Sequence, residues 1–70
     1  MEFDYSNLLG AMRANGRTQA DVAKAAGISE VSLRQKLKNR SEFKEKEMLL
    51  IKSFLGLPNY EDYFFIIKLA

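Results

Sequence analysis

The sequence predicts an all-α domain of four helices, followed by a short C-terminal segment that is extended or forms a strand. Apolar residues recur with helical spacing in four separate stretches, and glycines or short polar residues stand between these stretches. After Pro58 the composition changes to aromatic and β-branched residues, which favour a strand. We therefore divide the chain into a helical domain, residues 1–57, and an apolar tail, residues 58–70.

The length and the absent residue types limit the classes of function. Seventy residues allow one small domain. The chain has no cysteine and no histidine, which excludes disulfides, thiolate or imidazole zinc sites, and catalysis by a Cys or His nucleophile. The carboxylates are not paired in a recognisable way and no glycine-rich phosphate loop is present, so we expect neither an enzyme nor a cofactor. No apolar run reaches about 18 residues and no signal-peptide pattern opens the chain, so we expect a cytoplasmic protein without a membrane partner.

Capping residues delimit the first two helices. The first is expected to begin near Asp4–Ser6 and to end at Asn15–Gly16, residues that tolerate the left-handed conformation. Thr18 is expected to cap the second helix, and Asp21, three residues later, completes a capping-box pattern. The apolar residues of the second helix are small, which favours close approach to a neighbouring helix: Val22, Ala23 and Ala26.

The second and third helices have the spacing of a helix-turn-helix. Gly27 is expected to end the second helix, and Ser29 to cap a third that runs from about Glu30 to Lys38. Such a pair needs a small residue at the helix contact, a glycine four residues later and an apolar residue six positions further on, here Ala23, Gly27 and Leu33. A pair of this kind holds its second helix where the N-terminal turn and outer face can enter a DNA major groove.

The fourth helix and the tail complete the predicted elements. The helix is expected over Lys44–Leu55, with Glu45 and Glu47 on an exposed face that forms local charge pairs. The Gly56-Leu57-Pro58 sequence is a strong helix stop. In the tail we expect one helical turn at Asn59–Asp62 and then a strand over Tyr63–Leu69.

Positive charge is concentrated in the middle of the chain. Residues 13–40 carry a net charge of +5, whereas residues 1–12 carry −2 and residues 41–70 carry −1. A basic segment between acidic ends indicates one face that attracts a polyanion. The alternative interpretation of its RQKLKNR run is a solvated helix end, where cations are favoured in any case.

The combination of cap, small residues, turn glycine and leucine resembles the Xre-type helix-turn-helix family, which includes the Cro and lambda-repressor proteins. The core of the resemblance is TQADVAKAAGISEVSLRQKL, and the four-helix pattern extends it over about residues 3–57. FDYSNLLG, LRQKLKN and YEDYFFIIKL are also similar to a small phage-associated branch of that family. The resemblance implies a lambda-repressor-like fold and a sequence-specific transcription regulator of phage or prophage type that binds double-stranded DNA on the bacterial nucleoid.

The same resemblance places five residues on a base-reading face of the third helix: Ser29, Glu30, Val31, Arg34 and Gln35. The chemistry of several side chains supports these roles. Arg34 has a bidentate donor pair suited to guanine, Gln35 can donate to and accept from adenine, and Val31 can contact a thymine methyl group. Glu30 can accept from cytosine N4, although its charge repels phosphates.

Residues around that face are candidates for contacts with the DNA backbone. The resemblance implies that Gln19 meets the backbone or an outer base. Further candidates for phosphate contacts, which fix register without reading sequence, are Thr18, Lys36, Lys38, Asn39, Arg40, Ser41 and Lys44. We expect no small-molecule ligand, because the chain has no room for a separate sensing domain.

The tail carries more apolar surface than one small domain is expected to cover. A strand with two apolar faces would leave one side exposed on a monomer. We therefore expect a homodimer, with these residues at the contact: Tyr63, Phe64, Phe65, Ile66, Ile67 and Leu69. A two-fold dimer predicts an inverted-repeat operator whose half-site centres are about 34 Å apart.

A second class of function is consistent with the same residues. The modest net charge of +2, Glu30 on the reading face and the aromatic tail are features of a protein-interaction module, such as an anti-repressor or an antitoxin-like adaptor. Affinity for a DNA duplex that falls steeply with salt discriminates the two classes, because only DNA binding releases counterions.

Overall fold

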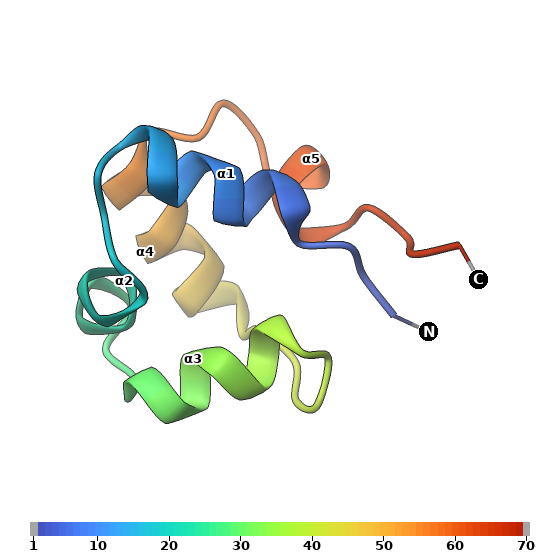
Figure 1. Cartoon of the computed structure of the whole chain (residues 1–70), viewed down its shortest axis with the longest axis horizontal. Coiled ribbons are helices and arrows are strands. Elements are labelled where there is room, and N and C mark those ends of the chain that lie inside the picture. The colour runs from blue at the N-terminus through green and yellow to red at the C-terminus, as the bar shows by residue number, and fades with distance from the viewer. Residues whose placement is uncertain (1, 70) are drawn as a thin grey trace.

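Five short helices follow one another in the computed structural model, which describes residues 2–69. They are α1 (Ser6–Ala14), α2 (Gln19–Ala26), α3 (Glu30–Leu37), α4 (Glu45–Leu55) and α5 (Glu61–Phe64). Figure 1 shows α3 along one edge of the molecule, with α1 and α5 on the opposite side and both chain ends leaving together. The all-α class is confirmed for the described residues. None of the helices in this part of the chain is long and apolar enough to cross a membrane.

The predicted caps at the centre of the chain are confirmed. Thr18 and Asp21 form a reciprocal capping box at the start of α2, and Gly27 ends that helix with a φ of 74°. The Ser29 hydroxyl accepts a hydrogen bond from the Ser32 N–H at 3.0 Å and so caps α3. Gly56 ends α4 with a φ of 66°. These four positions satisfy backbone groups that the helix ends would otherwise leave unpaired.

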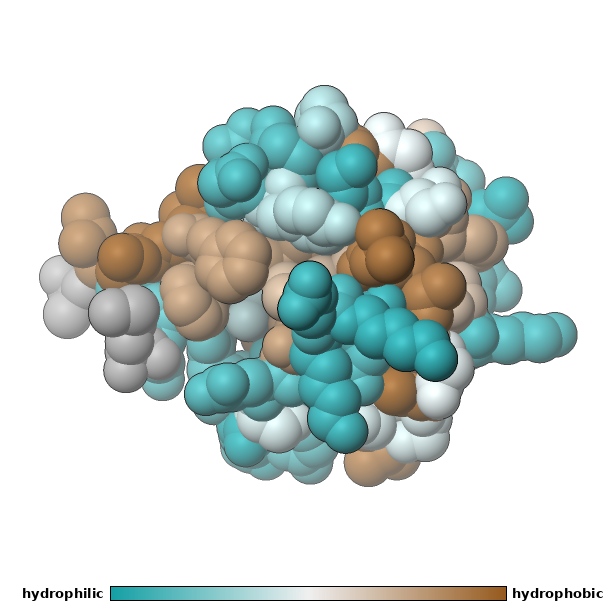
Figure 2. Space-filling view, turned by 180° about the vertical axis from the view of Figure 1, so that it is seen from behind, coloured by the Kyte–Doolittle hydropathy of each residue, from teal (hydrophilic) through white to brown (hydrophobic). Residues whose placement is uncertain are grey.

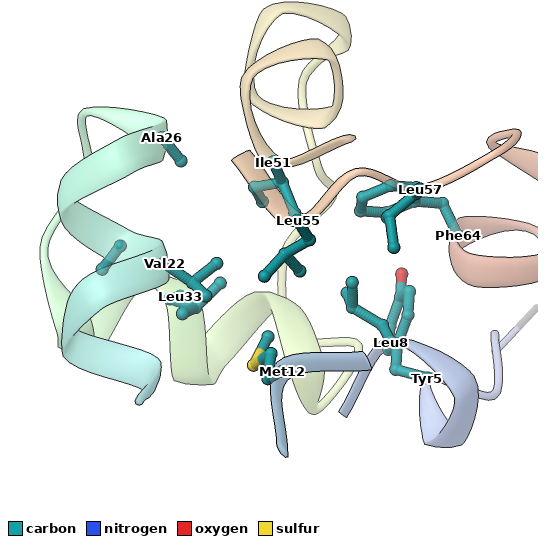
Figure 3. Packing of buried hydrophobic residues seen from close by; sticks show 11 residues of the cluster. Tyr5, Leu8, Met12, Val22, Ala26, Leu33, Ile51, Leu55, Leu57 and Phe64 are labelled. Carbon is teal, nitrogen blue, oxygen red and sulfur yellow. The ribbon is translucent and has the colours of Figure 1, made fainter. Parts of the chain in front are cut away.

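The core lies where α1, α2, α3 and α4 meet, and α5 closes it (Figure 3). Leu8 of α1, Leu33 of α3 and Ile51 of α4 have no exposed surface. The small residues of α2 let that helix pack against both α3 and α4, while α1 packs against α5. The full buried apolar set is Tyr5, Leu8, Met12, Val22, Ala23, Ala26, Leu33, Ile51, Leu55, Leu57 and Phe64.

The predicted strand over Tyr63–Leu69 is wrong. The chain forms α5 through Phe64, and then makes a single antiparallel bridge between Ile67 and Phe3. A local side-chain hydrogen bond favours the turn into the helix, because Asn59, which precedes the N-cap residue Tyr60, accepts from the Asp62 N–H at 2.9 Å. Burial explains the rest: Phe64 is 1% exposed, and the gain from placing its ring in the core exceeds the strand propensity of the sequence.

Phe64 is therefore expected to support the fold of a single chain. Phe64→Ala should lower the free energy of unfolding by about 3–5 kcal/mol, because it deletes a buried ring and leaves a cavity. That is comparable to the whole stability of a core this small, about 3–5 kcal/mol, so the variant should be largely unfolded. Ile67→Ala, at a residue that is 53% exposed, is the matched control. Urea titration by circular dichroism at low protein concentration distinguishes the two; equal effects would contradict the assignment of Phe64 to the core.

Candidate nucleic-acid interface

The turn between α2 and α3 fixes how α3 leaves the body of the protein. Gly27 has a left-handed backbone that side-chain-bearing residues rarely adopt, and its N–H donates to the Lys24 carbonyl at 3.2 Å. The next N–H, from Ile28, donates to the Ala23 carbonyl at 3.0 Å and brings a half-buried side chain back onto the core. Leu33 then anchors α3 through its inner face. The opposite face of α3 is left open to solvent.

The predicted base-reading residues line that open face. Val31 is 62% exposed, and 52% of the Arg34 side chain is exposed. Ser29 is exposed, although its hydroxyl already caps the helix, and Glu30 and Gln35 are half-buried. The structure thus brings the five predicted residues to one surface, with Val31 and Arg34 the most accessible of those that carry a reading side chain.

Glu30 and Arg34 interact with each other on this face. Their side chains approach to 3.6 Å between Oε2 and Nη2, one helical turn apart. A solvent-exposed pair with this spacing contributes about 0.3–0.5 kcal/mol, so an incoming acceptor can replace Glu30 at little cost. The pair reduces the positive charge of the open face without fixing the Arg34 guanidinium in place.

Exposed cations and polar groups border the face. Lys38, Arg40, Ser41 and Lys44 are all exposed and continue from the end of α3 through the following loop. At the start of α2, Thr18 is exposed and Gln19 is half-buried. The two helix N-termini also present backbone N–H groups, which favour anions.

Asp21 adds a fixed negative charge beside the start of α2. Hydrogen bonds from the backbone N–H of Thr18 and from the Thr18 side chain lower the pKa of Asp21 below its usual 3.8. The carboxylate therefore remains charged at neutral pH, and it serves as a cap rather than as a contact for a polyanion.

The structure contradicts the expectation that Lys36 is free to contact phosphate. Lys36 is only 6% exposed. Its Nζ lies 2.9 Å from Glu47 Oε1 and donates to the Glu42 carbonyl at 3.0 Å. The charge of Lys36 is thus paired inside the protein, between α3 and the start of α4, and is withdrawn from the predicted interface.

Glu47 was expected on an exposed helix face, and that expectation is also wrong. It is 7% exposed, and its Oε1 accepts from the Lys44 N–H at 3.0 Å as well as from Lys36. Burial by itself would raise the pKa of Glu47, but these two hydrogen bonds and the nearby lysine charges outweigh it and hold the pKa below the usual 4.5. The sequence did contain a signal for this role. In the Lys-x-x-Glu spacing, a glutamate three residues after the N-cap residue can accept a hydrogen bond from the N-cap N–H.

Asn39 also has a structural role in place of the predicted phosphate contact. Its Oδ1 accepts from the Phe3 N–H at 2.8 Å, and its Nδ2 donates to the Phe3 carbonyl at 2.9 Å. Asn39 has a φ of 62°, in the left-handed region that asparagine tolerates better than most residues. Both polar atoms of its amide are used within the chain, and it is withdrawn from the predicted interface.

The predicted dimer residues separate into buried and exposed groups. Phe64 lies in the core of the single chain and Tyr63 is half-buried against it, so the assignment of Phe64 to a dimer contact is wrong. The exposed fractions of the remaining four are 47% for Phe65, 36% for Ile66, 53% for Ile67 and 88% for Leu69. Figure 2 shows apolar surface beside the chain ends.

These exposed residues belong to a structure that we call the terminal ribbon, residues 2–4 paired with residues 66–68. The Asp4 N–H donates to the Ile66 carbonyl at 2.7 Å, and the Lys68 N–H donates to the Glu2 carbonyl at 2.9 Å. Ile67 lies opposite Phe3 between these two bonds. Because backbone groups alternate sides along an extended chain, the N–H and carbonyl of Ile67 point away from Phe3, toward the outer edge of the ribbon.

One family model matches most of this chain. It is described as "Protein of unknown function (DUF739)" and covers residues 1–66. The chain belongs to that family. No curated protein matches the sequence. The matched range spans all five helices and reaches the terminal ribbon, so the family shares the segments that carry the candidate interface.

The buried ion pair gives a test that is independent of any ligand. Glu47→Gln should destabilise the protein by about 3–5 kcal/mol, because it leaves the Lys36 charge buried without a partner. Lys36→Met combined with Glu47→Gln removes both charges and keeps an acceptor for the Lys44 N–H, so it should recover most of that loss. Chemical denaturation at pH 7 measures both variants. Equal destabilisation by the single and double variants would show that the charges are not coupled.

Acid adds a second readout to the same comparison. Glu47 has a lowered pKa, so its contribution is complete above its usual pKa of 4.5 and is lost as the pH falls through the lower folded value. The double variant should therefore lose less stability than the wild type below about pH 4.5. Asp4 and Asp21, whose pKa values are also lowered by hydrogen bonds, titrate in both proteins and cancel in the comparison.

Proposed function

We propose that this protein is a dimeric, sequence-specific DNA-binding regulator of phage or prophage type, with a lambda-repressor-like, Xre-type helix-turn-helix formed by α2 and α3. The observation that carries the proposal is the open outer face of α3, which presents Val31 and Arg34 to solvent while Leu33 secures the inner face. A helix held in this way can enter the major groove of DNA with its side chains directed at base edges.

The charges around α3 support a polyanion as the partner. Lys38, Arg40 and Lys44 are exposed in the segment that follows α3, and each can contact a phosphate. Arg34 has an acidic partner that a base or a phosphate can displace. The buried Lys36 contributes by holding α3 against α4, so its role is to position the helix that reads DNA.

The terminal ribbon supports the proposed two-fold dimer. Its outer edge presents the N–H and carbonyl of Ile67, which have no backbone hydrogen-bond partner among residues 2–69, and two such edges can pair antiparallel about a two-fold axis. The exposed side chains of Phe65, Ile67 and Leu69 lie beside that edge and would be covered by a second copy. An inverted-repeat operator requires that such a dimer present its two copies of α3 on one side.

The exposed apolar tail also favours the second candidate, a protein-interaction module such as an anti-repressor or an antitoxin-like adaptor. In that case the face of α3, including the Glu30–Arg34 pair, would contact a protein. The two candidate functions are separated by selecting duplexes from a random pool and then titrating binding of the selected duplexes with salt. We expect an inverted repeat and an affinity that falls steeply with salt; recovery of no sequence at low salt would overturn the DNA-binding proposal.

Arg34 and Lys38 are expected to differ in what they contribute to binding. Arg34→Ala should reduce discrimination at one base pair by about 1–3 kcal/mol, because it removes a bidentate donor to a base. Lys38→Ala should weaken all sequences similarly and lower the salt slope by about one, because it removes a phosphate contact. Fluorescence anisotropy on the selected duplex and its single-base variants measures both. Lys52→Ala, a lysine on α4 whose Nζ lies over the Tyr60 ring, is a control that should change neither quantity.

The dimer is tested by placing a charge on the terminal ribbon. Ile67→Asp should convert a wild-type dimer to a monomer in sedimentation velocity at tens of micromolar, because two carboxylates would be brought together at the paired edge. Leu49→Asp on α4, where the side chain is 54% exposed, is the matched control and should leave the dimer intact. A wild-type protein that sediments as a monomer at these concentrations would remove the dimer from the proposal.

A further inference from the structure

The side chain of Asn39 connects two parts of the molecule that have separate tasks in the proposed function. Asn39 follows the end of α3 by two residues, and its left-handed backbone closes the C-terminal end of that helix, with its N–H donating to the Lys36 carbonyl at 3.1 Å. Its amide holds Phe3, the central residue of one side of the terminal ribbon. One residue therefore contacts both the end of the proposed reading helix and the ribbon.

The geometry of this contact makes it stiff. Two hydrogen bonds of 2.8 Å and 2.9 Å join one planar amide to both polar groups of one residue, as a neighbouring strand would do. Phe3 is held from its other side by the bridge to Ile67, and its ring packs edge-on against Phe65 with centroids 5.8 Å apart. Within the described residues, the terminal ribbon thus has a direct hydrogen-bonded link to the end of α3.

We propose that Asn39 is a positioning residue that sets the direction of α3 relative to the terminal ribbon, and thereby determines which half-site spacing the dimer accepts. This inference rests on the proposed function. If two ribbons pair to form the dimer, the path between the two reading helices runs from one Asn39 through both ribbons to the other. A stiff link on each side restricts the separation and rotation of the two α3 helices. Avidity for two half-sites depends on how well this geometry matches the spacing of the half-sites.

The test compares affinity for duplexes that differ only in spacing. The probes are the selected duplex, versions with one base pair added to or removed from its centre, and a duplex that carries one half-site. Each added base pair rotates the half-sites by about a tenth of a turn. The wild type should lose about tenfold or more in affinity for either altered spacing, because one half-site can then no longer be engaged in register.

Asn39→Gly is the informative variant, because glycine adopts the positive φ without strain and lacks the amide. It should bind the single half-site within about twofold of the wild type, bind the selected duplex about tenfold less tightly, and lose under about threefold when the spacing changes. Asn39→Asp keeps the acceptor for the Phe3 N–H and loses the donor, so it should have an intermediate spacing preference. Asn15→Ala, which removes an amide bonded to the Ala11 carbonyl at the end of α1, should behave as the wild type.

The outcomes separate this inference from the proposed function. Sharp spacing preference in the wild type and its loss in Asn39→Gly support the inference. If the wild type binds DNA and both Asn39 variants keep its spacing preference, the role of Asn39 is overturned while DNA reading by α3 stands. A wild type that binds without any spacing preference overturns it as well. Failure of the wild type to bind any duplex overturns the proposed function itself.

Discussion

The ion pair between Lys36 and Glu47 is the interaction on which the position of α3 depends. Leu33 is buried in the core and Leu37, half-buried at the far end of α3, packs against it, but apolar contacts are not directional and do not by themselves fix the orientation of a short helix. Lys36 closes that end by reaching across to Glu47 and to the Glu42 carbonyl. Glu47 in turn accepts from the Lys44 N–H and so ties the first turn of α4 to the same point. Because both charges are buried, separating them would leave a buried charge without a partner, and this cost opposes opening of the α3–α4 loop.

Residues at the C-terminal end of α3 and just after it have two different roles, contacts within the protein and exposure to solvent. Lys36 and Asn39 face the protein and use their polar groups within it. Lys38 and Arg40, the alternating neighbours, face solvent. The basic character of residues 13–40 is therefore partly internal: one of the cations that produce the net charge of +5 is neutralised by a glutamate from outside that segment. Fewer exposed cations are therefore available to a polyanion than the net charge of the segment suggests.

The sequence was informative for most local features, although the hydrogen bond from the Lys44 N–H to Glu47 was missed. The capping box at Thr18 and Asp21, the Ser29 cap and the left-handed Gly27 and Gly56 all follow from residues within a few positions of one another. The exposed face of α3 was also predictable, because helical periodicity places Val31, two residues from the buried Leu33, on nearly the opposite side of the helix. The roles of Lys36 and Asn39 were not, because their partners lie on other elements and only the fold brings them together. In the sequence, a lysine and an asparagine close to arginines are typical of phosphate contacts, and only their burial in the fold shows that they have another role.

In the tail, too, packing in the fold decides the structure, here against the local propensity of the sequence. Strand propensity predicted a strand over Tyr63–Leu69, whereas the described residues of this segment form the end of α5 and one isolated bridge, between Ile67 and Phe3. The core requires a large apolar residue where Phe64 lies. The hydrogen bond from the Asp62 N–H to the Asn59 side chain turns the chain so that the Phe64 ring enters the core. A domain of this size without disulfides has little apolar surface to spare. The residues that remain exposed after α5 are therefore the ones that the single chain cannot bury, and they lie on the ribbon that Asn39 joins to α3. Association through that ribbon and orientation of α3 would then be set by one continuous set of hydrogen bonds.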